Sequence, residues 1–126
     1  MRPKTLAAVA ELALQGESFD LCLREFLDEF YRQPAQAALN PEPGLLREAL
    51  PAKGEVYDAY LAATAEALAN HAGLDTPNWA YAAGRKLHHP WFALTLASLR
   101  AVLLLESPAA FRSRNLFVSE NALSRV

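Results

Sequence analysis

The sequence predicts an all-α fold, a compact single-domain bundle of about six to eight helices, several of them short. Alanine and leucine dominate a hydrophobic fraction of 52%, and these two residues lose little on entering a helix. Helix caps and stops also alternate along the chain with apolar residues at helical spacing. At 126 residues the chain fits one domain, residues 1–126, whose core needs no disulfide or metal.

The first two helices are predicted over residues 5–15 and 18–32. The first carries its apolar residues on one stripe and stops at Gly16, a residue that readily takes the left-handed conformation closing a helix. Ser18 is a capping residue, and the residues after it alternate an apolar inner face with an acidic outer face. Both segments are therefore predicted to form amphipathic helices.

The middle of the chain predicts two short helices and one long helix. Residues 34–39 form a short helical turn, and the Pro- and Gly-containing segment 40–44 is the clearest break in the chain. Residues 45–50 are expected to form a short helix that ends before a proline. The long helix begins at residue 54 or 55 and runs through 71, with Gly73 as its terminator.

The second half contains two further capping signals. Thr76-Pro77 predicts a helix that ends at Gly84, and a connection over residues 85–90 follows it. Trp91 and Phe92 are expected to lead into a helix from about Thr95.

That helix ends at Glu106, and its run 101–105 is apolar all round, which predicts a central position. Ser107-Pro108 repeats the cap-proline signal and predicts a last short helix through Arg112 or Arg114. Residues 115–118 form a turn or a short extended piece, and Ser119 is a final cap.

Net charge argues against generic binding of polyanions. The formal charge of the chain is −2 and its isoelectric point about 5.9, so no global field attracts nucleic acid or an anionic membrane. The charge is uneven, since residues 1–63 hold six Lys and Arg against ten Asp and Glu, and residues 64–126 hold six against four. This asymmetry is typical of solvated helix faces and also favours head-to-tail association or one charged partner.

The sequence predicts a cytoplasmic protein without a disulfide. Cys22 is the only cysteine, and its place between two leucines indicates a small buried hydrophobe. The N-terminal segment resembles a signal peptide, but Glu11 interrupts it and it fits an amphipathic helix better. No apolar run approaches the roughly 20 residues needed to span a bilayer, so no membrane association is expected.

No recognisable catalytic set, metal site or cofactor site is predicted. His88 and His89 are adjacent, no metal-ligand spacing is present, and the glycines are scattered as helix stops. The absence of such a set favours a protein that binds a partner over an enzyme. The alternative is a small helical enzyme or ribonuclease that uses Arg85, His88 and His89. Helical ribonucleases of the HEPN type separate the arginine and histidine further along one helix, whereas this pair lies in a loop.

The C-terminal segment 107–126 is predicted to form an interface, because arginines and aromatic residues gather there and both are enriched at protein contacts. A second alternative is a regulator that stacks these residues on nucleic acid, but the patch is thin for phosphate binding. The predicted partner-binding residues are Phe111, Arg112, Arg114, Phe117, Val118, Trp91 and Trp79.

Three segments resemble a family of short bacterial proteins. They are the tail that includes E-S-P-A-A-F-R-S-R-N-L-F-V, the segment L-R-E-F-L-D-E-F-Y and the segment D-A-Y-L-A-A-T-A-E-A-L-A. The family resembles the small partner in two-gene, toxin-antitoxin-like modules whose larger member is a nucleotidyltransferase-like protein. The resemblance runs from about Thr5 to Val126 and carries over no catalytic residues.

These observations predict a non-enzymatic protein-binding module. The resemblance implies an antitoxin-like or regulatory role in a two-gene module, with a nucleotidyltransferase-like protein as partner. Association of the chain with itself is left open at this stage.

Overall fold

The computed structural model describes residues 2–93 and 97–125 and shows a mostly helical chain. These residues contain five α-helices, three short 3-10 turns and one two-stranded sheet. None of the described helices is both long and apolar enough to cross a membrane. The prediction of a mostly helical fold is confirmed, and the small sheet is an element that the all-α prediction lacked.

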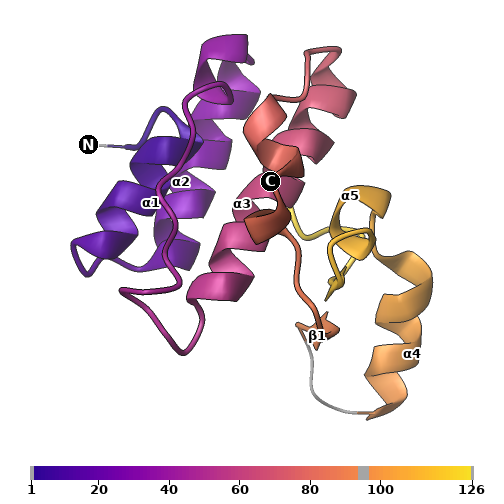
Figure 1. The fold of residues 1–126 in the computed structure, drawn as a ribbon. Coiled ribbons are helices and arrows are strands. Elements are labelled where there is room, and N and C mark those ends of the chain that lie inside the picture. Colours follow the sequence, from indigo (N-terminus) through magenta and orange to yellow (C-terminus); the bar gives the residue numbers. More distant parts are fainter. Residues whose placement is uncertain (1, 94–96, 126) are drawn as a thin grey trace.

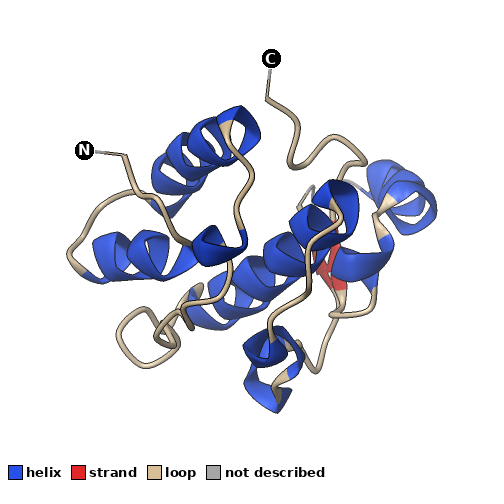
Figure 2. Ribbon diagram, turned by 90° about the horizontal axis from the view of Figure 1, so that it is seen from above, coloured by secondary structure: helices blue, strands red, loops and turns tan. Residues whose placement is uncertain are grey.

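The longest helix, α3 (Gly54–Ala72), occupies the middle of the structure (Figure 1). On one side of it lies the helical hairpin of α1 (Leu6–Leu14) and α2 (Phe19–Arg32). On the other side lie α4 (Ala97–Glu106) and α5 (Ala109–Arg112). Figure 2 shows the same division from above, with the strand pair close to α3.

The hairpin of α1 and α2 begins and ends as the sequence predicts. The Thr5 hydroxyl accepts a hydrogen bond from the Ala8 N–H at 3.0 Å, and the Ser18 hydroxyl accepts one from the Leu21 N–H at 3.2 Å. Each bond satisfies an N–H group that the first turn of a helix leaves unpaired. Gly16, with φ +100°, supplies the positive backbone angle of the turn between the helices.

The main core lies where the hairpin meets α3. Phe26 and Leu27 of α2 and Leu61 of α3 are at most 2% exposed. The Phe19 ring stacks on the Tyr57 ring at a centroid distance of 4.0 Å, which joins the start of α2 to the first half of α3. This core fixes α3 relative to the N-terminal half of the chain.

The short helix predicted over residues 45–50 is absent, and this segment forms turns instead. The Leu46 N–H donates to the Asp58 carboxylate at 2.7 Å, and the Leu46 side chain is fully buried. Gly54 lies directly against this segment, because a Cβ atom there would stand 2.4 Å from the Arg47 Cα. The segment is shaped by α3, a long-range partner that helical spacing does not reveal.

The helix predicted from Thr76 to Gly84 consists of two 3-10 turns, Asn78–Tyr81 and Ala83–Arg85. Ala82 between them is extended, with ψ 149°, which interrupts helical hydrogen bonding. The Trp79 indole N–H donates to the Leu39 carbonyl at 3.0 Å and holds the first turn against the earlier loop.

The two strands, β1 (Trp91–Phe92) and β2 (Leu116–Phe117), are paired in parallel. The Trp91 N–H donates to the Asn115 carbonyl at 2.8 Å. Asn115 adopts φ +62°, and its side-chain amide donates to the Leu87 carbonyl at 2.6 Å, which holds the turn before β2. The segment expected to lead into α4 is thus a strand at Trp91 and Phe92, and of the two forms expected for residues 115–118, a turn or an extended piece, Leu116 and Phe117 take the extended one.

The start of α4 expected at Thr95 lies outside the described residues, while its end at Glu106 is as predicted. After β2 the chain returns to α2, where the Tyr31 hydroxyl donates to the Leu123 carbonyl at 2.8 Å. The Arg125 guanidinium pairs with the Asp28 carboxylate at 2.9 Å and lowers the pKa of that carboxyl group. No helix follows Ser119 in the described residues, which form turns there.

Gly54→Ala should destabilise the protein by about 1–3 kcal/mol, because the added methyl group meets the backbone of the Leu46–Arg47 segment. Helix propensity alone predicts the opposite sign, since alanine favours a helix over glycine. Urea denaturation followed by circular dichroism measures the change.

Gly44→Ala is the matched control, because nothing lies within 4 Å of a Cβ atom at Gly44. This variant should be neutral or stabilised by about 0.4–1 kcal/mol through a less flexible unfolded chain. Equal unfolding midpoints for the two variants would show that α3 does not pack closely on the Leu46–Arg47 segment.

Candidate functional site

The C-terminal half of α4 presents large apolar side chains to solvent. Val102 and Leu104 are each 47% exposed and Leu105 is 85% exposed, whereas Leu103 between them is 2% exposed. We call Val102, Leu104 and Leu105 the α4 patch. Single exposed leucines are common on protein surfaces, but contiguous apolar patches mark interaction sites.

α4 is held by its inward side and by its C-terminal end. The helix packs against β2, and Leu103 is the buried residue on that side. The Ser107 hydroxyl accepts a hydrogen bond from the Val118 N–H at 2.9 Å and lies within hydrogen-bonding distance of the Leu103 and Val118 carbonyls. Because these bonds fix the end of the helix to the tail, the α4 patch is presented in a defined orientation.

The strand pair supports the other end of this surface. The Phe92 and Phe117 rings stack at a centroid distance of 5.0 Å, so the two strands are joined by side chains as well as by their backbones. The exposed Arg100 of α4 places its guanidinium 5.1 Å from the Phe92 ring centroid. A positive charge therefore borders the α4 patch.

The structure corrects the prediction that the apolar run 101–105 is central. Figure 1 shows α4 at the edge of the molecule, away from the hairpin of α1 and α2. An all-apolar run indicates burial, but it does not distinguish burial within the chain from burial against a partner. The sequence therefore contains the signal for this surface, but the apolar run by itself predicts the wrong environment for it.

The seven predicted partner-binding residues are mostly interior. Five side chains are at most 8% exposed, Arg112 is exposed, and Trp91 is partly buried. The five buried residues are Phe111, Arg114, Phe117, Val118 and Trp79. In the folded chain a partner therefore reaches Arg112 and part of Trp91, while the other five residues belong to the core.

Arg114 illustrates how a basic tail residue serves the fold. Its guanidinium donates to the Glu66 carboxylate at 2.6 Å, to the Ala110 carbonyl at 2.7 Å and to the Ala80 carbonyl at 2.9 Å. It also lies 5.8 Å from the centroid of the Tyr81 ring, whose hydroxyl donates to Glu66. These contacts join α5 to α3 and to the 3-10 turn Asn78–Tyr81.

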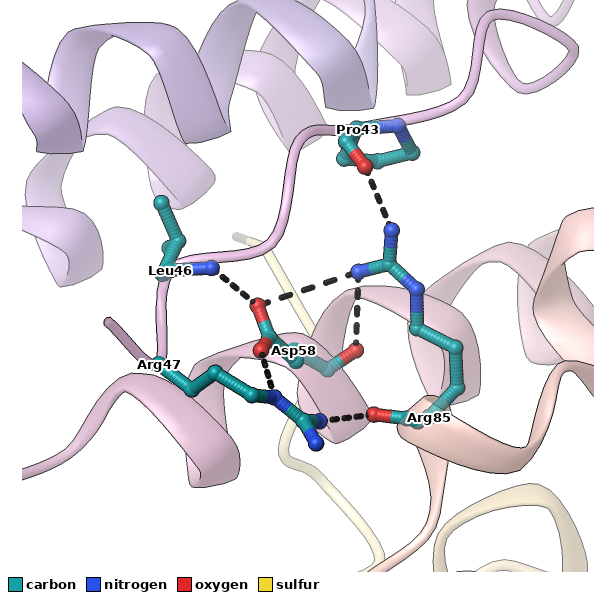
Figure 3. Close-up of polar contacts among 6 residues, drawn as sticks. Pro43, Leu46, Arg47, Asp58 and Arg85 are labelled. Atoms are coloured by element: carbon teal, nitrogen blue, oxygen red, sulfur yellow. Dashed lines mark hydrogen bonds and ion pairs between the residues drawn. The ribbon is translucent and has the colours of Figure 1, made fainter. Parts of the chain in front are cut away.

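Asp58 organises a second buried cluster of polar groups (Figure 3). Its carboxylate is fully buried and accepts hydrogen bonds from the Leu46 N–H at 2.7 Å and from Arg47 Nε at 3.0 Å. Arg85 lies 3.9 Å from the same carboxylate and also donates to the Pro43 carbonyl. Arg47 donates in turn to the Gly84 carbonyl, so the cluster joins three segments that are distant in sequence.

Arg85 is therefore placed in the interior, at 1% exposure, with its guanidinium 5.0 Å from the Trp79 ring centroid. Burial lowers the pKa of Arg85 from its ordinary value, and the Asp58 carboxylate acts in the opposite direction. His88 and His89 are exposed. The alternative nuclease site therefore combines a buried arginine, Arg85, with two histidines that lie on the surface.

The described residues contain no group of three or more His, Cys, Asp and Glu side chains arranged to hold a metal ion. Cys22 is buried, as predicted, and burial together with the charges of Glu17 and Glu25 raises the pKa of its thiol. These factors oppose formation of a reactive thiolate.

Comparison of the chain with known proteins finds no matching family model, no significant match to a curated protein and none to a solved structure.

Asp58→Ala should lower the free energy of unfolding by about 3–5 kcal/mol, because it leaves the buried Arg85 guanidinium without its negative partner. The double variant Asp58→Leu, Arg85→Met should recover much of this loss, since an apolar pair removes both charges together. Urea denaturation of these two variants and of the wild type measures the loss and its recovery.

Asp28→Ala is the control, because it also removes a carboxylate paired with an arginine, but at the surface. Its unfolding midpoint should stay close to that of the wild type, as expected for exposed ion pairs. If Asp58→Ala unfolded at the same urea concentration as Asp28→Ala, the buried cluster would not be a main support of the fold.

Proposed function

We propose that this protein is a non-enzymatic protein-binding module that uses the α4 patch as its contact surface. The observation that carries this proposal is the exposure of Leu105, at 85%, beside Val102 and Leu104 on one ordered helix. An exposed leucine that becomes buried contributes about 1.5–3 kcal/mol to association. The three side chains therefore supply a hydrophobic centre for an interface.

The geometry fits recognition of a helix by a groove. α4 is ten residues long and is held at its C-terminal end by Ser107, so it presents its apolar residues as a rigid unit. Partners bind such helices by enclosing apolar residues spaced three or four apart, as Val102 and Leu105 are. Arg100 and Arg112 are exposed and add positive charge, which favours a partner with an acidic rim.

For the partner we propose a nucleotidyltransferase-like protein encoded beside this chain in a two-gene module of the cytoplasm. The support is the resemblance of the tail and of the α2 and α3 segments to the small member of such modules. The chain would then have an antitoxin-like or regulatory role, in which binding covers the α4 patch. The charge asymmetry of the two halves supports a single defined orientation of binding.

The alternatives have less support. An enzyme that uses Arg85 and the neighbouring histidines requires a guanidinium that here donates to the Pro43 carbonyl and lies beside the buried Asp58. Nucleic-acid binding by the tail would need both predicted arginines at the surface. Arg112 is exposed, but Arg114 is only 5% exposed. Self-association through α4 uses the same surface and is separated from the main proposal by the experiment below.

Leu105→Asp should weaken binding to the co-expressed partner by at least about 2 kcal/mol, roughly 30-fold, because it places a charge at the centre of the apolar contact. Co-purification followed by isothermal titration calorimetry measures this loss. Light scattering of the isolated chain at increasing concentration reports self-association. A dimer that Leu105→Asp dissociates, with no effect on partner binding, would replace the partner by a second copy of the chain.

Leu104→Asp and Leu21→Asp form a matched pair, since both leucines are 47% exposed and both lie on helices. Leu104→Asp should weaken the partner complex, and Leu21→Asp on α2 should leave it unchanged. Circular dichroism establishes that each variant is folded. Equal affinity of the two folded variants for the partner would exclude the α4 patch as the contact.

A further inference from the structure

A pocket of about 310 Å³ lies between the start of α2, the first half of α3, β1 and the tail that follows β2. Four aromatic residues contribute to its walls, and two charged residues also line it. The aromatic residues are Phe19, Tyr57, Tyr60 and Trp91, and the charged residues are Asp20 and Lys53. We call this cavity the aromatic pocket.

The packing of the fold accounts for the aromatic walls. Phe19 stacks on Tyr57 and meets Tyr60 edge to face at 6.2 Å. The far side of Tyr60 packs on the fully buried Phe111 at 4.9 Å. The pocket is therefore built on rings that the core already holds in place, which lowers the entropy cost of binding a ligand there.

Polar groups of the pocket walls remain available to a ligand. Within the part of the chain that the structure describes, the Tyr60 hydroxyl and the Trp91 indole N–H have no hydrogen-bond partner, and no fully buried polar side-chain atom lacks one. Both residues are only partly buried, so part of each side chain is accessible. Burial, with a smaller contribution from the charge of Asp20, raises the pKa of Tyr60 to about 12.

The charged residues of the pocket are also uncompensated. Neither Asp20 nor Lys53 forms an ion pair with another described residue. The lining thus contains an acceptor, Asp20, and two donors, Lys53 and Trp91, together with hydroxyl groups that can act as either. The hydroxyl groups belong to Tyr57, Tyr60 and Ser119. A peptide group offers both an N–H and a carbonyl, so it satisfies both kinds of wall group.

We propose that the aromatic pocket receives one aromatic side chain of the protein partner, with the adjoining peptide groups bonded to the polar residues of the pocket. The volume lies at the lower end of the range for ligand pockets, roughly 300–1,000 Å³, which leaves room for one side chain with its adjoining peptide groups. Aromatic anchors in such pockets often dominate interfaces. This inference rests on the proposed function, since the anchor belongs to the same partner.

β1 lies between the aromatic pocket and α4. Trp91 lines the pocket, and the next residue, Phe92, lies under the Arg100 guanidinium of α4. Successive residues of a strand point to opposite faces, so β1 presents one residue to each region. A partner that contacts both regions therefore extends past β1 from one face to the other.

The test uses N-acetyl-tryptophanamide, an uncharged molecule with one indole side chain and a peptide group on each side of its Cα atom. Titration into the ¹⁵N-labelled protein should shift the Trp91 indole N–H and the amides of Tyr57 and Tyr60, with a Kd on the order of 1 mM. N-acetyl-alaninamide at the same concentration should shift none of them. Absence of binding by the tryptophan analogue, or shifts located elsewhere, would overturn the proposal.

Ala93→Trp should reduce the affinity for the analogue at least tenfold, because Ala93 is exposed and its new ring occupies the pocket. Ala37→Trp makes the same change at an exposed alanine outside the pocket and should bind like the wild type. Tyr60→Phe, which removes only the hydroxyl, should weaken binding about threefold. Unchanged affinity in both pocket variants would contradict the assignment.

Leu105→Asp separates this inference from the proposed function, because Leu105 does not line the pocket. This variant should bind the analogue normally while losing the partner. Loss of the partner in Leu105→Asp with no analogue binding to the wild type would reject the pocket and leave the α4 contact standing. Normal analogue binding with an unaffected partner complex would support the pocket and reject the α4 contact.

Discussion

The buried carboxylate of Asp58 is the constraint on which the arrangement of the chain depends. A charge without exposure needs compensation, and three elements supply it: the Leu46 N–H, the Arg47 side chain and the Arg85 guanidinium. All three groups must stay in place, because loss of any one leaves the buried charge less well compensated. The cluster therefore holds the irregular segment before α3 and the 3-10 turns after it against the same helix.

A second set of polar contacts positions the C-terminal half. Arg114 joins Glu66 of α3 to carbonyl groups of two other segments, and Ser107 joins the end of α4 to Val118. These bonds direct Phe111 and Val118 inward, where they contribute to the core beside α3. In this arrangement α4 packs on β2 through Leu103, and the side chains of the α4 patch face solvent.

The two candidate contact regions have complementary physical properties. The α4 patch offers apolar area on a convex helix, which contributes affinity but discriminates weakly between apolar partners. The aromatic pocket offers a concave shape lined by both hydrogen-bond donors and acceptors, which contributes specificity. A partner that uses both regions across β1 obtains hydrophobic stabilisation from the first and orientation from the second.

Local chemistry in the sequence determined the start and end of each long helix and the loop between α2 and α3. Thr5, Ser18, Gly16 and Gly73 act within a few residues of their own positions, so their roles are readable without a fold. Asp58 and Glu66 interrupt the apolar stretches of α3 and are a further local signal of polar contacts.

The tertiary structure alone decided which groups those local elements meet. Residues 45–50 form turns in place of the predicted helix, and the Leu46 N–H is bonded to Asp58. Trp91 is extended because Asn115 and Phe117 lie beside its strand. Arg114 and Phe117 are interior, and Leu105 is exposed, although composition suggested the reverse. Burial depends on partners that are distant in sequence, and periodicity records only that a side chain is apolar, not what covers it.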